Sequence, residues 1–537
     1  MFARYTCALS FTFLFIISLM IQAQKPGDEY QAVDRAATTE AMDDAEALPA
    51  SVTIRKSQVI RPWSPQLFGY NHNWIWANKM IMDQEKPDSL DLDPAYLKLV
   101  EGSPLPLNRM SGTGSQYFSW KKAIGPLSDR EPMSLTHWQK APEVQRAGPV
   151  EWINSVLRTD PQAKFVWVFN MTKDSVADCA DMVEFLTGDP EHDKNGDINW
   201  AAKRVKLGLP EPVRVAAWEL GNEIDWHRHI AVAEYIKQCQ AIIKAVRAID
   251  PEARFAAHAA TAPWSTAAKK PRADGDWKVW HREVLKTLGE DIESLVLHPY
   301  YHGLPIPELE EKYLNVLRDD ILSITGSDRI KLFISEHAMW PPRPKDQQWS
   351  TTWYQTHGLI GSLATAEWLN RMLNRPDIGM MTYHCYSGGP WGAIYRDKEG
   401  TLYTTAIHEM FNLLLNHGGT QVLATEVKGE MADIHVNDLS LTVTAIETAS
   451  GLNLVLVNRD PNTPRELTFT FEKNYHLNSE TTLTAKDLHA YNTSSDRPIT
   501  INTTVNDSTK PFTTYTLAPK ALTILTLSRV TDDLAQD

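Results

Sequence analysis

The sequence predicts a mixed α/β protein, in which a (β/α)8 barrel precedes a C-terminal β-sandwich. Three observations support this prediction. Eight short apolar segments alternate with helical stretches between residues 65 and 420, which is typical of a parallel sheet. Most of these segments are continuously apolar, as expected of strands that are buried on both faces. Beyond residue 420, Thr-rich segments alternate apolar with polar residues, which indicates a sandwich.

The first 50 residues lie outside this barrel. Residues 1–23 have the pattern of an export signal, because Arg4 precedes an apolar run and Ala23 fits the small-residue rule for cleavage. A membrane anchor is the alternative, but the run is shorter than the ~20 residues that cross a bilayer. Residues 24–50 are polar, acidic and aperiodic, which predicts a disordered linker. We therefore expect a secreted or periplasmic protein without membrane contact once the signal is removed.

Residues 51–64 contain a further strand, which we expect to join the sandwich and not the barrel. The barrel should span residues 65–420, and its predicted strands cover residues 67–71, 105–110, 164–170, 213–220, 254–258, 294–298, 330–335 and 379–384. The clearest helix between them covers residues 231–250, where apolar residues recur at intervals of three and four. A large doubly wound sheet is the alternative to a barrel. No Gly-rich phosphate loop follows the first strand, which disfavours its dinucleotide-binding form.

Residues 421–537 form the predicted sandwich, with Leu467, Phe469 and Phe471 on one face of a strand and threonines on the other. The net charge of −14 argues against a nucleic-acid partner. The three cysteines beyond the signal are an odd number without metal-ligand spacing, so we expect buried thiols. Residues 191–197 resemble a calcium loop, but Ala202 stands where the twelfth-position Glu would be. We expect no metal and no cofactor, and the oligomeric state is left open.

Two glutamates close predicted strands in positions that suit glycosidic bond cleavage. Glu223 follows the fourth strand, and Glu336 ends the seventh. Active sites of such barrels lie at the C-terminal ends of the strands. In retaining glycosidases one carboxyl protonates the leaving oxygen and the other, about 5–5.5 Å away, attacks the anomeric carbon. A single glutamate at a strand end is more often a salt-bridge partner or a solvated rim residue. The pair, however, predicts a retaining glycoside hydrolase with Glu223 as acid/base and Glu336 as nucleophile.

Several segments around these glutamates match a known pattern, namely residues 109–114 (RMSGTG), 120–126 (WKKAIGP), 177–188 (ADCADMVEFLTG), 220–225 (LGNEID) and 297–301 (LHPYY). Glu336 is also followed by Trp340 at a characteristic spacing. With these motifs the chain resembles the clan A glycoside hydrolases and, within them, the family 51 α-L-arabinofuranosidases. The resemblance runs from about residue 65 to the C-terminus.

The resemblance implies roles for four residues around the two glutamates. Asn222 would hydrogen-bond the sugar 2-OH, an interaction that strengthens in the transition state. Arg109 and Tyr300 would keep Glu336 ionised and oriented. A structural salt bridge is the alternative for Arg109. His298 would line the subsite of the cleaved sugar, although a buried core histidine is the alternative.

Trp340 is a candidate platform for a sugar face, and packing of loops at the barrel mouth is the alternative. Two departures from the family pattern concern sugar recognition. Asn73 stands where the family has a Glu that contacts arabinose, and Thr113-Gly114 replaces a segment with Asn. We therefore expect a sugar subsite altered away from arabinofuranose, in which Asn73 takes part.

The bulky neighbours of Asn73, namely Tyr70, His72 and Trp74, are candidates for new contacts to a flatter pyranose. The expected partner is a plant or algal poly- or oligosaccharide. Other clan A activities, such as those of a β-xylosidase, a β-galactanase or an agarase, remain alternatives. A catalytically dead carbohydrate-binding protein is the alternative of another class, and the presence of both glutamates argues against it.

Overall fold

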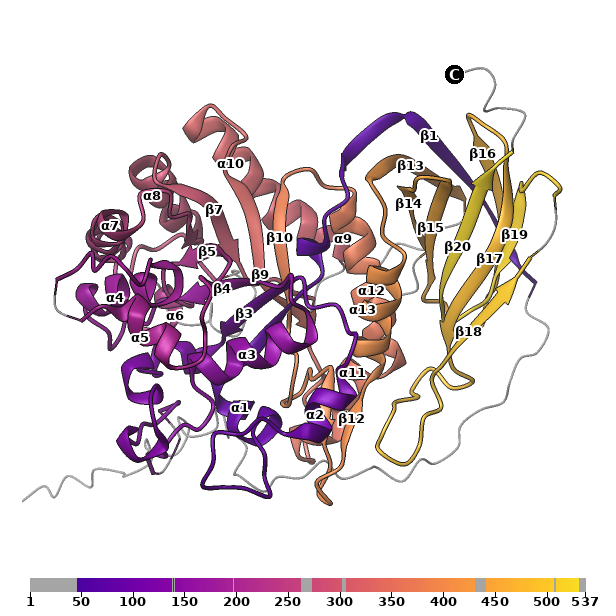
Figure 1. The fold of residues 1–537 in the computed structure, drawn as a ribbon. Helices are drawn as coiled ribbons and strands as arrows, with labels where there is room; N and C mark the ends of the chain where they lie inside the picture. The colour runs from indigo at the N-terminus through magenta and orange to yellow at the C-terminus, as the bar shows by residue number, and fades with distance from the viewer. Residues whose placement is uncertain are drawn as a thin grey trace, which may run out of the picture.

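The computed structural model describes residues 46–137, 139, 141–196, 198–261, 273–301, 306–429, 441–506 and 509–530. The predicted export signal and most of the predicted linker lie outside the described residues. None of the helices within the described ranges has the length and apolar character needed to cross a bilayer. Figure 1 shows a barrel surrounded by helices and, beside it, a sheet formed mainly by the C-terminal part of the chain.

Eight parallel strands form the barrel, and it closes because β10 pairs with both β2 and β9. The strands are β2 (Gly69–Asn73), β3 (Leu107–Ser111), β4 (Lys164–Val168), β5 (Val215–Glu219), β6 (Phe255–His258), β7 (Ile292–Leu297), β9 (Lys331–Met339) and β10 (Ile378–His384). Each of the predicted strand segments overlaps one of them. The predicted barrel is therefore confirmed, with Glu223 following its fourth strand and Glu336 on its seventh.

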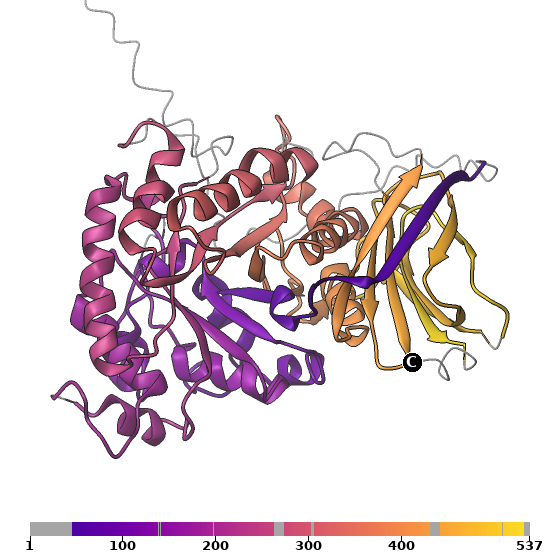
Figure 2. The ribbon, with the colours of Figure 1, turned by 90° about the horizontal axis from the view of Figure 1, so that it is seen from above.

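Helices cover the outside of the barrel (Figures 1 and 2). The helix predicted at residues 231–250 is α7, Val232–Ile249, which packs between α4 (Val176–Thr187) and α8 (Trp277–Leu288). Besides short 3-10 and π-helical turns, the other α-helices and strands described in this part are α1 (Trp74–Ile81), α2 (Pro94–Leu99), α3 (Pro149–Thr159), α5 (Trp200–Lys206), α6 (Ile224–His227), β8 (Tyr300–Tyr301), α9 (Ile306–Leu309), α10 (Asn315–Thr325), α11 (Tyr354–His357), α12 (Leu359–Leu373), β11 (Ile394–Arg396), β12 (Leu402–Thr404) and α13 (Ala406–Asn416).

The second part is a nine-stranded sheet in the order β18-β17-β20-β15-β14-β13-β1-β16-β19. Its strands are β1 (Leu48–Pro62), β13 (Gln421–Gly429), β14 (Leu441–Glu447), β15 (Gly451–Asn458), β16 (Arg465–Phe471), β17 (Tyr475–Thr484), β18 (Thr500–Val505), β19 (Thr514–Leu517) and β20 (Ala521–Arg529). Val52 and Ile54 share one buried core with Leu454 and Leu525, from strands on the other side of β13 in the sheet order. The sheet therefore curls around a core, as in a sandwich.

The N-terminal strand β1 lies in this sheet, antiparallel to β13 and parallel to β16 (Figure 2). Val52 is paired with Phe469, far along the chain. The strand begins at Leu48, so residues 48–50 belong to a strand and not to the predicted linker. The alternation of buried Ala50, Val52 and Ile54 explains this earlier start, because these side chains face the core of the sheet.

A layer of apolar side chains fills the barrel below the C-terminal ends of the strands. Its buried members are Leu107, Val166, Ala217, Ala256, Val296, Phe333 and Met380, one from each of seven strands. Side chains two positions apart on a strand face the same side. The residues two positions further along each strand therefore also point into the barrel. They are Arg109, Val168, Glu219, His258, His298, Ser335 and Thr382, and all except Val168 are polar. This polar layer is the base of the site.

Candidate active site

The backbone after β5 brings Glu223 over the polar layer. Gly221 has φ 87° and Glu223 itself has φ 48°, in the left-handed region that non-glycine residues seldom adopt. Such outliers gather at functional sites. The Glu223 side chain is 20% exposed, and its Oε1 lies 3.0 Å from Nδ1 of His298. The loop thus turns this carboxyl towards His298, which directly follows β7.

Glu336 is almost fully buried and is surrounded by donors. Tyr300 donates a hydrogen bond of 2.7 Å to Oε2, and Nη1 of Arg109 donates one of 3.0 Å to Oε1. Nδ1 atoms of His298 and His384 each lie 3.8 Å from Oε2. Burial by itself would raise the pKa of Glu336, but the charges of these histidines and of Arg109 hold it below its usual value. Glu336 is therefore kept as a carboxylate.

The two glutamates face each other across a short gap. One carboxylate oxygen of Glu223, one of Glu336 and a ring nitrogen of His298 all lie within 4.8 Å of one another. In retaining glycosidases the two carboxyl groups are about 5–5.5 Å apart, whereas inverting enzymes need roughly 6.5–9.5 Å to admit a water molecule. This separation matches the retaining arrangement.

Arg109 is both a structural ion pair and a contact of the site. It is fully buried, and its Nε and Nη2 donate hydrogen bonds of 2.6 Å to the two carboxylate oxygens of Glu219. Its Nη1 reaches Glu336, as described above. Burial lowers the pKa of Arg109, but the charges and hydrogen bonds of Glu219 and Glu336 together raise it. Arg109 therefore forms a structural salt bridge with Glu219 and also contacts Glu336, so both of the expected roles are observed.

Asn222 is held by the same arginine. Its Oδ1 accepts a hydrogen bond of 2.8 Å from Nη2 of Arg109. Its buried Nδ2 has no hydrogen-bond partner among the described residues. An unsatisfied buried donor is costly, so a ligand oxygen at this position would be favoured. This fits the expected contact between Asn222 and a sugar hydroxyl.

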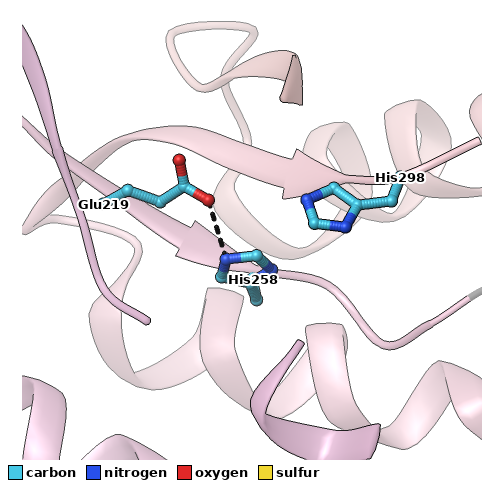
Figure 3. Close-up of side chains that lie close together, drawn as sticks. All are labelled: Glu219, His258 and His298. Atoms are coloured by element: carbon cyan, nitrogen blue, oxygen red, sulfur yellow. Dashed lines mark hydrogen bonds and ion pairs between the residues drawn. The ribbon is translucent and has the colours of Figure 1, made fainter. Parts of the chain in front are cut away.

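In the polar layer below Glu223 and Glu336, a hydrogen bond joins Glu219 and His258, and His298 lies beside this pair (Figure 3). Nε2 of His258 is 2.9 Å from Oε1 of Glu219 and 2.7 Å from the carbonyl of Gly221, so it carries a proton and donates to both. These three residues, and also Glu223, His298 and Glu336, have donor atoms close enough to hold a metal ion. The guanidinium of Arg109 already occupies both oxygens of Glu219, and its charge would repel a cation there.

Aromatic rings form one wall beside Glu336. Trp340 is partly buried and packs edge-on against Tyr300, with ring centroids 5.1 Å apart. It also stacks on Trp349 at 5.7 Å and meets Trp391 at 5.1 Å. Because Tyr300 hydrogen-bonds Glu336, this aromatic cluster is in direct contact with the residues around Glu336. Both interpretations of Trp340, packing of loops and a platform for a sugar, are compatible with these contacts.

Asn73 lies at the edge of the site, next to the other altered segment. Its Oδ1 accepts a hydrogen bond of 3.0 Å from the amide of Ile75 and so caps α1. A Cβ atom added to Gly114 would lie 3.5 Å from Oδ1 of Asn73, and one added to Gly112 would lie 3.0 Å from its Nδ2 and 3.7 Å from Cε1 of His384. The two departures from the family pattern, Asn73 and Thr113-Gly114, are thus neighbours in space.

The bulky neighbours of Asn73 do not reach the site, so the expectation of new sugar contacts from them is wrong. Strand alternation turns Tyr70 and His72 away from the barrel interior and towards the helices. Tyr70 packs against Phe411, while His72 hydrogen-bonds Asn108, and burial lowers the pKa of His72 to about 4. Trp74 is 3% exposed. It stacks on a phenylalanine ring 3.7 Å away.

Four residues of the site were not predicted from the sequence, namely Glu219, His258, Ser335 and His384. His384 ends β10, and its Nδ1 has no hydrogen-bond partner among the described residues. His258, Ser335 and His384 each end one of the predicted strand segments. A search for polar residues at the ends of predicted strands would therefore have found them, because these ends meet at one face of a barrel.

Two family models match the chain. The α-L-arabinofuranosidase 1 domain matches residues 107–282, and the α-L-arabinofuranosidase C-terminal domain matches residues 336–520. The chain belongs to the arabinofuranosidase-like glycoside hydrolases of family 51. The first match contains Glu223 and the second begins at Glu336, so the two matches together include both glutamates of the site.

Curated relatives of this glycoside hydrolase match over a little more than a third of the chain. An intracellular exo-α-(1→5)-L-arabinofuranosidase of Streptomyces lividans is 26% identical over 34% of this chain and 26% of its own length. The protein of the same name from Acetivibrio thermocellus is 26% identical over 38% of each chain. The match therefore spans well under half of these relatives. Among solved structures, an α-L-arabinofuranosidase from Thermotoga maritima in an arabinose complex shares the fold, with a TM-score of 0.71 and 19% identity over 90% of this chain and 100% of that one.

Proposed function

We propose that this chain hydrolyses glycosidic bonds of plant or algal poly- and oligosaccharides with retention of configuration, as an arabinofuranosidase-like enzyme. The observation that carries the proposal is the short gap between Glu223 and Glu336, in which one carboxylate oxygen of each lies within 4.8 Å of the other. A gap of this size leaves room for an anomeric carbon between the two groups, but not for an additional water molecule.

In the first step, the Glu336 carboxylate attacks the anomeric carbon while Glu223 gives its proton to the leaving oxygen. This forms a glycosyl ester on Glu336 and releases the first product. Arg109 and Tyr300 keep the attacking carboxylate ionised and in place through their hydrogen bonds to its two oxygens. Asn222 offers its free amide donor to the sugar.

In the second step, Glu223 takes a proton from a water molecule, which attacks the same carbon and displaces Glu336. The two inversions give net retention. Proton NMR of the first product released, before the anomers equilibrate, tests the proposal. The expected product has the configuration of the substrate, and an inverted product would refute the mechanism.

For the sugar itself, we infer weaker recognition of arabinofuranose than the names of the relatives suggest. Asn73 and Thr113-Gly114 lie together at the edge of the site, where the family pattern has residues that contact arabinose. Asn73 uses its Oδ1 to cap a helix, so only its Nδ2 remains to contact a sugar. A panel of aryl glycosides that includes an α-L-arabinofuranoside and several pyranosides tests this inference.

We also propose that the chain is exported, on the strength of the apolar segment at its N-terminus. The names of the curated relatives describe intracellular proteins, so this chain would differ from them in location. Fractionation of cells that express the full chain, followed by N-terminal sequencing, tests export. A chain that starts at Met1 and stays in the cytoplasm would refute it.

A further inference from the structure

Ser335 connects the acid/base side of the site with the buried ion pair beneath it. This serine precedes Glu336 on β9 and has no exposed surface. Its Oγ lies 2.8 Å from Nε2 of His298 and 3.3 Å from Oε1 of Glu219. A hydroxyl carries one proton, so it donates to only one of these two neighbours and turns a lone pair towards the other.

The carboxylate of Glu219 decides the direction of these hydrogen bonds. Burial raises the pKa of Glu219, but Arg109 and His258 bring it down to about 2, so Glu219 is an acceptor at neutral pH. If Ser335 donated to His298, lone pairs of Oγ and Oε1 would face each other at 3.3 Å in a fully buried contact. Ser335 therefore donates to Glu219, and its oxygen accepts a hydrogen bond from the Nε2–H group of His298.

This assignment determines which group His298 presents to Glu223. Nδ1 of His298 lies 3.0 Å from Oε1 of Glu223. With Nε2 protonated, the ring is either neutral, with Nδ1 as an acceptor, or cationic, with Nδ1 as a donor. In the first state Glu223 holds the proton between the two atoms, and in the second state His298 holds it. The contact contains one proton in both states.

We propose that Ser335 is a positioning residue that keeps a transferable proton shared between His298 and Glu223, by fixing the ring with Nε2 protonated. The role rests on Glu223 being the acid/base, as proposed above. Without the hydroxyl, the neutral ring can carry its proton on Nδ1 and donate it to an ionised Glu223. That state stabilises the carboxylate, which has no proton to give to the leaving oxygen.

The proton balance of the reaction is unchanged by this role. Glu223 gives a proton to the leaving oxygen and later recovers one from water, while Ser335 gains and loses none. Burial lowers the pKa of His298, but Glu336 and Glu223 raise it above its usual value, against the charge of Arg109. The ionisable groups that face or lie near His298 are Glu223, Glu336, Arg109, Glu219, His258, Tyr300 and His384. None of them is removed by a substitution at Ser335.

The test compares Ser335→Ala with Ser335→Thr, which keeps a hydroxyl, on substrates with a poor and with an activated leaving group. The alkaline limb of the pH profile of kcat/KM reports loss of the proton from the acid/base. For the poor leaving group we expect Ser335→Ala to shift this limb to lower pH by about one unit, which is the effect of one hydrogen bond. Ser335→Thr should leave the limb at the same pH as in the wild type. The activated substrate should respond less, because it needs less help from an acid.

A Ser335→Ala protein that is folded, as judged by its circular dichroism, and that keeps the alkaline limb of the wild type would overturn the proposal. A second measurement needs no variant at Ser335 and no turnover. Nitrogen-15 NMR of histidine-labelled protein, with His298 assigned by its loss in His298→Asn, should show Nε2 protonated. A neutral ring with the proton on Nδ1 would also overturn the proposal. Since this readout is independent of catalysis, it separates failure of this role from failure of the proposed function.

Discussion

Removing the charge of Glu219 should destabilise the barrel, because this carboxylate is the buried partner of Arg109. Its usual pKa of 4.5 falls to about 2 in the folded protein. At about 1.4 kcal/mol per pKa unit, this lowering of the pKa corresponds to about 3–4 kcal/mol of stability. This agrees with the ~3–5 kcal/mol that breaking one side of a buried ion pair costs.

Glu219→Gln keeps the size of the side chain but replaces one acceptor by an amide donor. In the wild type Oε1 accepts hydrogen bonds from Arg109 and His258, and Oε2 accepts one from Arg109. In either orientation, the NH2 group of the glutamine would therefore face an N–H donor. We expect the free energy of unfolding, measured with urea at pH 7, to fall by about 3 kcal/mol. Glu466→Gln, at an exposed position of β16, is the matched control and should change little.

The pH dependence has a defined sign. The folded-state pKa of Glu219 is depressed, so its contribution is fully present above about pH 4.5 and is lost as the pH falls towards about 2. The difference between the wild type and Glu219→Gln should therefore shrink in acid. A Glu219→Gln protein within about 0.5 kcal/mol of the wild type at pH 7, the range of a neutral surface change, would refute this reasoning.

Three further predictions concern catalysis. Glu223→Ala should lose about 10²–10⁴-fold in turnover of poor leaving groups and less with activated aryl glycosides, where azide should restore part of the rate; equal losses on both would count against the acid/base role. Tyr300→Phe removes the 2.7 Å hydrogen bond to Glu336, so ionisation of Glu336 becomes harder. The acidic limb of the pH profile of kcat/KM should therefore shift to higher pH by about one to two units. An unmoved limb would contradict this. On aryl α-L-arabinofuranoside, two altered sugar contacts should lower kcat/KM by roughly 10²–10⁴-fold relative to the preferred glycoside; a wide preference for the arabinofuranoside would show that Asn73 and Thr113-Gly114 do not set the specificity.

Much of the barrel was predictable because strands buried on both faces give continuous apolar segments. The strands that pair with β1 could not be predicted, because the partners of Val52 are Val427 and Phe469, which are distant in the sequence. The sequence pattern indicated that β1 is a strand that joins the sandwich and not the barrel, but it did not identify the strands with which β1 pairs. The start of β1 at Leu48 depends on those distant partners as well.

Glu223 and Glu336 were predictable because each belongs to a recognisable motif at a strand end. Ser335 and His384 carry no motif, and their roles arise only when the closed barrel brings strand ends together. Tyr70 and Trp74 show the opposite error. Their side chains suit a sugar, but strand alternation and the capping of α1 by Asn73 direct them elsewhere.

The central claim is that Glu336 forms a covalent bond to the sugar. The most direct test is peptide mass spectrometry of Glu223→Ala after rapid mixing with an activated aryl glycoside that it still cleaves. Loss of the acid/base slows release of the sugar by water, so the intermediate should accumulate. We predict that the mass of one glycosyl group is added to the peptide that contains Glu336. Burst release of the aryl group with the sugar attached to a different residue, or with no sugar attached to the protein, would contradict the account.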